Sequence, residues 1–477
     1  MQTKAPTLEL AGWVSRLRYE QLPTPAVDTV RKCLLDAIGC GIYGRDRESA
    51  AIVSDWVEEA ACLPSGYRGA TAWGDERPAF RPHDAALVNG VAVHALELDD
   101  FHNAKLHPGA AIIPAAMAVA EHVGAGGKQL LTAIAAGYEV MIRTSKALNP
   151  TAARLRGWHL TGVCGPLGAA AAAASLLGLD QNKTAWALGL AGTQGSGLWA
   201  FNADGAMSKS FHAGRAAQSG VMAAQLARRG FSGPTQLYEA ADGSFLRAYS
   251  DSASAQVLTA RLGEEYHLCT IGIKPYAACA STHAYIDAAL ALRERFGAKL
   301  ADIQALKIGC TKVVDIQCGY QYVPATTVTA QMSVRYCVAS TLLRGLPAPM
   351  HFDPPFLSEQ EVVALAQSIA IERSQELEDL FPEHLSGWLS VQLGGKWERA
   401  DVIDPVGSQG NPIEWNGIVS KFRTLLARHG SPEQLGNIVD LVARVEDRKC
   451  GELTAAMRGL AKSEEGERAA DRYEVAR

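Results

Sequence analysis

The chain has 477 residues, of which 48% are hydrophobic and 20% are charged, and its formal net charge is −5. This length is enough for a large buried core, and the slight excess of acid gives no support for nucleic acid or an anionic membrane as a partner. The segment 1–10 has no apolar signal-peptide region, and the Ala-rich segment 167–179 is too short to cross a bilayer. The ten cysteines include no Cys-x-x-Cys pair, which indicates free thiols and a cytoplasmic protein.

The first 265 residues predict a series of helices. Val27, Val30, Leu34 and Ile38 repeat at helical spacing, as expected for the buried face of a helix. Asp180 is expected to cap the helix that runs through residues 185–190, because a short acidic side chain can accept a bond from a free N–H of the first turn. Further helical patterns cover residues 130–148, 165–177 and 213–229.

The sequence pattern changes near residue 265. Apolar residues alternate over 267–273, 306–310, 389–393 and 397–402, which predicts strands, the last two joined as a hairpin through Gly394 and Gly395. Helical patterns over 283–296, 330–343 and 359–369 lie between them. We therefore expect residues 266–400 to form a compact α+β unit. Residues 401–477 return to helix over 415–426 and 435–445 and end in a charged tail from Lys462, so the predicted fold class is mainly α.

The segment 94–109 is the first candidate for chemistry. It combines three acidic residues, three histidines and a lysine, an unusual density for a chain of ordinary charge. His107-Pro108-Gly109 predicts a loop that enters a helix, and helix N-termini attract anions such as a carboxylate substrate. The alternative is a polar loop whose aspartates cap helices. Asp and His can also bind a metal, but regular ligand spacing is missing and we expect no metal.

Three further segments place titratable residues beside Gly or Pro. His159 lies between two glycines, which would let a ligand approach the backbone, although a structural histidine is an alternative. Lys209 begins a helix, where a cation gains nothing from the helix dipole, so it indicates either an anion site or a solvated basic turn. Lys274 follows the predicted strand, and Cys279 would be a thiol nucleophile only with an orienting partner that the sequence does not show.

The chain resembles the MmgE/PrpD family in five motifs that occur in one order: ELDDFHNAKLHPGAAIIPAA, GWHLTGVCGPLGAAAAAASLLGLD, KSFHAGRAAQSG, IKPYAACASTHAYIDAA and AQMSVRYCVA. The resemblance covers about residues 7–450. It implies a large all-helical domain built from residues 1–265 and 401–477, with a smaller α+β lid domain, 266–400, inserted between them. It also implies a homodimer that needs no metal, nucleotide or other cofactor.

The resemblance also implies site residues. His107, His159, Lys209 and Lys274 stand where the family's decarboxylases have catalytic residues. Other positions differ from that pattern, which weighs against cis-aconitate decarboxylation, and a missing Ser-Asp-Asn run after His107 weighs against 2-methylcitrate. This chain has Glu97 where the family's decarboxylases have an Asp, Phe101 where they have a Thr, and Cys279 where they have a His. A later Tyr of the family corresponds to Tyr320 or Tyr322, because the spacing is not fixed.

The family's reactions share a change of protonation at a carbon next to a carboxylate. We therefore expect a cofactor-free lyase that acts on a small di- or tricarboxylic acid, with His107 and His159 as the acid and base and Lys209 and Lys274 holding the carboxylates. An epimerase of a dicarboxylate such as iminodisuccinate is the first alternative, and a non-catalytic carboxylate-binding protein is the second. The expected substrate-binding residues are Glu97, Asp99, Asp100, His102, Cys279, Tyr320 and Tyr322. Asp99 and Asp100 are expected to orient His107, cap a helix or tune a pKa.

Overall fold

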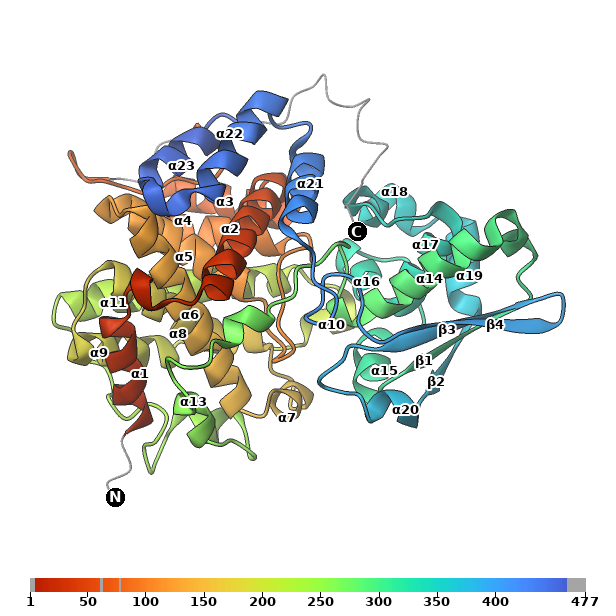
Figure 1. Cartoon of the computed structure of the whole chain (residues 1–477), viewed down its shortest axis with the longest axis horizontal. Coiled ribbons are helices and arrows are strands. Elements are labelled where there is room, and N and C mark those ends of the chain that lie inside the picture. The colour runs from red at the N-terminus through yellow and green to blue at the C-terminus, as the bar shows by residue number, and fades with distance from the viewer. Residues whose placement is uncertain (1–4, 61–62, 77–78, 461–477) are drawn as a thin grey trace.

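A computed structural model describes residues 5–60, 63–76 and 79–460. The chain forms a helical body and a smaller part that contains a sheet (Figure 1), so the prediction of a mainly α fold with a small α+β region is confirmed. No helix within the described ranges combines the length and apolar character needed to cross a membrane. The charged tail from Lys462 lies outside the described residues.

The helical body is built around α8 and α11, which are rich in small residues and pack on each other. A Cβ added to Gly220 of α11 would lie 2.4 Å from the Cβ of Ala169 on α8, so this glycine is what allows the helices to approach so closely. The first helices of the chain are α1 (Pro6–Arg16), α2 (Thr24–Gly44), α3 (Glu48–Glu59), α4 (Pro82–His94), α5 (Pro108–Val123), α6 (Gly127–Ala147), α7 (Pro150–Leu155), α8 (Leu160–Leu176), α9 (Gln181–Gly192), α10 (Phe201–Asp204), α11 (Ser208–Arg228), α12 (Phe245–Tyr249) and α13 (Gln256–Thr259).

The α+β part contains a four-stranded sheet of order β2-β1-β3-β4. Strand β1 (Ala305–Cys310) pairs in parallel with β2 (Ile369–Arg373) and antiparallel with β3 (Gly387–Leu393), which forms a hairpin with β4 (Lys396–Val402). Helix α14 packs on β3 and β4 and helps to bury a second apolar core. The helices of this part are α14 (His283–Phe296), α15 (Lys312–Cys318), α16 (Thr327–Gln331), α17 (Val334–Arg344), α18 (Pro354–Leu357), α19 (Gln360–Ser368) and α20 (Gln375–Glu378).

The last helices return to the helical body, where α21 (Trp415–Leu426) and α22 (Pro432–Ala443) pack on α2, and α23 (Cys450–Met457) packs on α5. In Figure 1 these blue helices lie beside the red and orange ones from the start of the chain. A buried ion pair between Lys421 of α21 and Asp36 of α2 joins the two ends, and the Lys421 ammonium also donates to the Leu98 carbonyl at 2.6 Å. Segments distant in sequence therefore fix the loop that follows α4.

The predictions of helices and strands are confirmed where apolar spacing, a turn or a capping residue marks the element. The predicted strand 306–310, the hairpin, and the helices over 283–296, 359–369 and 415–426 are confirmed within a few residues. Asp180 caps α9 as predicted, since its Oδ1 accepts from the Lys183 N–H at 2.9 Å. All nine described cysteines are free thiols, as expected, while Cys62 lies outside the described residues.

Two predictions about elements are wrong, and one strand was not predicted. Residues 267–273 do not form a strand that would end at Lys274. His267–Thr270 is a 3₁₀-helix, the Leu268 N–H donates to Glu139, and only Gly272 pairs with Phe101, because these residues pack on the helical body and meet no sheet edge. The predicted helix 330–343 is interrupted, since the Ser333 side chain caps a new helix, α17. Strand β2 was not expected, because it follows α19 with no intervening loop signal.

Candidate active site

A buried carboxylate joins the two predicted lysines. Glu97 follows α4, Lys209 lies in the first turn of α11, and Lys274 lies after the 3₁₀-helix. One Glu97 oxygen accepts from the Lys209 ammonium, and the other lies 3.3 Å from the Lys274 ammonium, which also donates to the Glu97 carbonyl at 3.0 Å. Glu97 has a φ of 54°, a left-handed conformation that is uncommon outside glycine. The backbone conformation thus presents one side chain to both cations.

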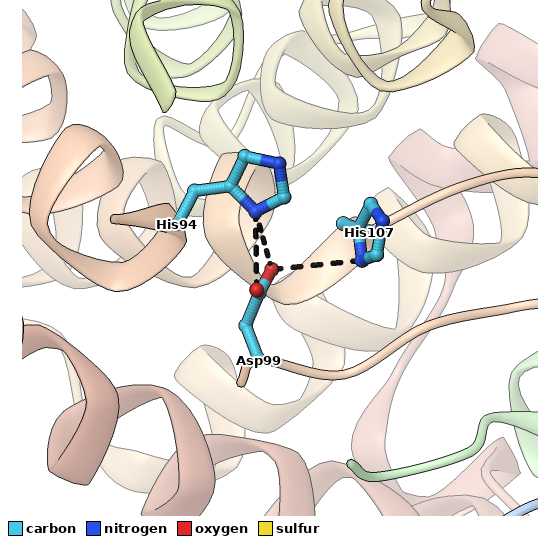
Figure 2. A group of neighbouring side chains, drawn as sticks. All are labelled: His94, Asp99 and His107. Atoms are coloured by element: carbon cyan, nitrogen blue, oxygen red, sulfur yellow. Dashed lines mark hydrogen bonds and ion pairs between the residues drawn. The ribbon is translucent and has the colours of Figure 1, made fainter. Parts of the chain in front are cut away.

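A directed hydrogen-bond chain continues from Lys209 to Asp99 through His94, the last residue of α4. The Lys209 ammonium can only donate, so its 2.9 Å contact makes His94 Nε2 an acceptor. The proton of the neutral His94 ring is then on Nδ1, which donates to the Asp99 carboxylate at 2.9 Å (Figure 2). His94 was not selected from the sequence, although its spacing of five residues from Asp99 places the two at one helix end.

His107 is the residue that precedes α5, and the Asp100 main chain holds its ring. Its Nδ1 lies 2.9 Å from the Asp100 carbonyl, which can only accept, so Nδ1 carries the proton. In the neutral ring Nε2 therefore has a free lone pair. The ring centroid lies 4.7 Å from that of His94 and close to Asp99, as Figure 2 shows. Orienting His107 was one of the three roles expected for Asp99 and Asp100, with capping a helix and tuning a pKa; the Asp100 contact to His107 is made by its backbone carbonyl.

His159 occupies the corresponding position before α8. Its Nδ1 lies 3.0 Å from His212 Nδ1, and its buried Nε2 has no hydrogen-bond partner among the described residues. The ring stacks 6.0 Å from His94 and is enclosed on other sides by Trp199 and Phe201. A buried polar atom without a partner is costly, so this nitrogen is available to a ligand.

A pocket of about 60 Å³ lies between the helical body and the α+β part. Two larger hollows, of about 270 and 320 Å³, lie elsewhere, and neither is lined by the candidate residues. Lys209, Lys274, Glu97 and Asp99 are almost fully buried and do not line this pocket. Its walls are formed by Phe101, His102, Asn103, Lys105, Leu106, His107, Arg154, His159, Trp199, Cys279, Ala280, Ser281, Gln317 and Leu385.

Charge and burial set the protonation of the cluster. Burial alone would raise the pKa of Glu97, but the charges of Lys209 and Lys274 hold it well below its usual range. Burial alone would lower the pKa of Lys274, but the charges of Glu97 and Asp99 raise it. Burial, with the nearby lysine charges, lowers the pKa of His107 and of His159 well below the usual range. Both imidazoles are therefore neutral at neutral pH.

Asp100 and His102 have their polar atoms used within the fold. Asp100 accepts from the Gly109 N–H at 2.8 Å and from the Tyr138 hydroxyl at 2.6 Å, so it caps α5, the alternative weighed for this segment. Burial raises the pKa of Asp100 to about 7. His102 bonds Thr270 through Nε2 and accepts from the Ala104 N–H through Nδ1. These contacts shape the loop around His107.

The remaining predicted residues belong to the α+β part. Cys279 lines the pocket, and a bond from the Cys318 thiol lowers the pKa of the Cys279 thiol. The nearby His283 ring contacts the Ala278 carbonyl through its Nε2. The Tyr320 hydroxyl donates to the Thr329 carbonyl at 2.6 Å and the Tyr322 hydroxyl to the Leu357 carbonyl at 2.9 Å. The pocket walls thus include Cys279 but neither tyrosine.

His94, Asp99 and His107 place three potential metal-ligand atoms within 4.8 Å of one another. The ring nitrogens nearest Asp99 are the two Nδ1 atoms. Both face oxygen acceptors and carry protons in this arrangement, and a protonated nitrogen cannot ligate a metal. A metal ion here would require both rings to change tautomer or turn, so the donor set fits a hydrogen-bond chain better than a metal centre.

The comparisons with known proteins agree with the geometry. A model of the MmgE/PrpD N-terminal domain matches residues 8–258, and a model of the MmgE/PrpD C-terminal domain matches residues 276–447. The chain belongs to the MmgE/PrpD family. The family resemblance seen in the motifs is therefore confirmed.

Several members of the MmgE/PrpD family match almost the whole chain. A cis-aconitate decarboxylase-like protein of Aspergillus oryzae is 28% identical over 92% of this chain and 94% of its own length. Cis-aconitate decarboxylase of Homo sapiens is 27% identical over 96% of each chain. 2-Methylcitrate dehydratase of Cupriavidus necator is 26% identical over 87% of this chain and 89% of its own length. These names describe lyases, as the family resemblance implied.

Proposed function

We propose that this MmgE/PrpD protein is a lyase that removes carbon dioxide or water from a small di- or tricarboxylic acid, without a cofactor. The observation that carries the proposal is the pair His107 and His159, which line one pocket. The buried Nε2 of His159 has no hydrogen-bond partner among the described residues, and the contact that holds the His107 ring uses its Nδ1 and not its Nε2. Two neutral imidazoles beside a buried charged cluster suit proton transfer next to a carboxylate. The lyase names of the relatives support the same reaction class.

His107 is the better candidate for the base. Its Nδ1 proton is fixed by the Asp100 carbonyl at 2.9 Å, which leaves the Nε2 lone pair to accept a proton. A bound anion would favour the imidazolium and so raise the low pKa of His107 as the substrate arrives. In a dehydration, His107 would take the proton from the carbon next to the carboxylate.

His159 is the better candidate for the acid. If its Nδ1 accepts from His212, the buried Nε2 carries the proton, on a ring that lines the pocket. In a dehydration, that proton would go to the departing hydroxyl group, which leaves as water with the electron pair of the carbon–oxygen bond. In a decarboxylation, the electrons of the broken carbon–carbon bond would stay on carbon, and His159 would protonate that carbon.

The lysines act through the buried cluster in this proposal. Lys209 and Lys274 are already neutralised by Glu97 and Asp99, so they set the potential around the histidines more than they bind substrate directly. This changes the role that the sequence predicted for them. Homodimer formation and a cytoplasmic location stay predictions.

Proton NMR in deuterated water tests the proposal with cis-aconitate, citrate, 2-methylcitrate and iminodisuccinate as candidate substrates. A lyase gives a product that has lost water or carbon dioxide, and treatment with a metal chelator leaves the rate unchanged. His107→Ala and His159→Ala should each lower turnover by about a hundredfold or more with the fold intact, whereas His122→Ala, on the far end of α5, should not. Deuterium exchange with inversion and no new product would identify an epimerase instead.

A further inference from the structure

The buried cluster leaves no positive charge for a substrate. Lys209 and Lys274 supply two cations, and Glu97 and Asp99, whose pKa values are both lowered despite burial, supply two anions. His107 and His159, whose pKa values burial lowers well below the usual range, are neutral. A dicarboxylate that enters the pocket therefore needs other cations to balance its charge.

Arg154 is a buried cation without a carboxylate partner. It lies in α7 with 6% of its surface exposed, and its Nε is buried and has no hydrogen-bond partner in the described part of the chain. No carboxylate in the described ranges lies within salt-bridge distance of it. Its guanidinium carbon lies 3.4 Å from the centre of the Trp199 ring. Stacking fixes the guanidinium plane and leaves its edge for two parallel bonds to a carboxylate.

Lys105 is the second such cation. Its φ of 63° is left-handed, and the backbone pairing of His102 with Leu106 closes a tight loop around it. The ammonium lies 4.4 Å from the centre of the Phe381 ring in the α+β part and has no ion-pair partner among the described residues. Holding a lysine in this conformation costs free energy, which a role for its side chain would explain.

Both cations face the reacting groups. Arg154 and Lys105 line the same pocket as His107 and His159. Burial lowers the pKa of Lys105 to about 8; the Cys279 thiol opposes this effect and the positive charge of Arg154 adds to it. Burial also lowers the pKa of Arg154 to about 10. Both side chains are therefore mainly protonated at neutral pH and repel each other until an anion lies between them.

We infer that Arg154 and Lys105 form the anion subsite that holds the substrate carboxylate distant from the reacting carbon and so selects di- and tricarboxylates over monocarboxylates. The inference rests on the proposed function. Arg154 supplies the directional contact, because its plane is fixed by Trp199, and Lys105 supplies a point charge from the loop that carries His107.

Isothermal titration calorimetry with tricarballylate tests the subsite. This saturated tricarboxylate has no hydroxyl group to lose and no double bond, so its binding is measured apart from turnover, and butyrate is the monocarboxylate control. Arg154→Gln and Lys105→Gln should each raise the Kd for tricarballylate about tenfold or more, and Arg154→Lys should recover part of the loss. The matched control is Arg156→Gln, since Arg156 is 41% exposed and already paired with Asp251 at 2.8 Å.

The outcomes separate the two proposals, provided that thermal unfolding shows each variant to be folded. His159→Ala should still bind tricarballylate within a few-fold of the unmodified protein while losing turnover. Wild-type affinity in both Arg154→Gln and Lys105→Gln would overturn the subsite and leave the proposed reaction standing. Equal affinity of the unmodified protein for butyrate and tricarballylate would also overturn the subsite. Failure of the unmodified protein to bind any tested polycarboxylate would overturn both.

Discussion

Glu97 decides the electrostatics of the site at the scale of single residues. Its carboxylate contacts both Lys209 and Lys274, and all three side chains are nearly inaccessible to solvent. A pair of buried cations would be very unfavourable without it. The extra methylene of Glu, compared with the Asp that the family resemblance places here, gives the carboxylate the reach to bridge two lysines from one backbone position.

Replacing Glu97 tests this role. Glu97→Gln removes the negative charge and leaves two buried ammonium groups, so the free energy of unfolding should fall by about 3–5 kcal/mol. Chemical denaturation measured by circular dichroism gives this value. The control is Glu414→Gln, whose own side chain is 78% exposed and whose partner Lys32 is 21% exposed, with an expected change below about 1 kcal/mol. Equal changes in the two variants would show that the lysines do not need Glu97.

The lowered histidine pKa values predict a pH profile. Burial, with the nearby lysine charges, keeps His107 and His159 neutral below their usual pKa of about 6.5. A base that is active when neutral loses activity only as the pH falls through its own pKa. The value of kcat/KM should therefore stay level from pH 7.5 to below pH 6.5, measured on the substrate found by NMR. An acidic limb centred near pH 6.5 would contradict these shifts.

At the scale of elements, the start of α5 joins three parts of the body. Asp100 caps the helix through Gly109, bonds Tyr138 of α6, and offers its carbonyl to His107. Earlier in the same loop, Lys421 of α21 donates to the Leu98 carbonyl and Lys274 donates to the Glu97 carbonyl. This loop is thus positioned by helices from both ends of the chain, which explains how a left-handed Glu97 is maintained.

Asp100→Asn tests the cap through its pH dependence. The pKa of Asp100 is about 7 in the folded protein, above its value of about 3.8 when exposed. A raised pKa stabilises the fold at low pH, and this stabilisation is lost as the pH rises through 7. Asn can accept from Gly109 but has no charge, so the variant should gain about 1–3 kcal/mol relative to the unmodified protein between pH 5 and pH 8.5. Thermal unfolding at both pH values measures this difference, and an offset that is the same at both would contradict the raised pKa.

At the scale of the whole molecule, the sequence predicts helices and strands well where a capping or turn residue marks the end of the element. Asp180 and the pair Gly394-Gly395 mark a helix start and a hairpin turn without any tertiary information. The 267–273 segment fails because alternation does not reveal whether a sheet edge is near, and here the partner is the helical body. A strand of five residues such as β2 carries too short a pattern to be separated from the helix before it.

For the site as well, the sequence predicts single residues but not how distant segments meet. His107, His159, Lys209 and Lys274 were predicted because the resemblance to the MmgE/PrpD family implies catalytic residues at these positions, in segments that also contain Gly or Pro. That Glu97 neutralises both lysines could not be predicted, since it depends on how α4, α11 and a distant loop meet. Arg154 was missed for a related reason: its stacking on Trp199 and its lack of a carboxylate partner among the described residues are visible only in three dimensions.

A crystal structure of the protein soaked with cis-aconitate or citrate is the most direct test of the account. The account predicts ligand density in the pocket between the helical body and the α+β part, with its reacting carbon beside Nε2 of His107 and of His159 and a carboxylate toward Arg154. The buried lysines should keep their contacts with Glu97. Density elsewhere, or imidazoles that point away from the bound acid, would contradict the central claim that these two histidines share one substrate.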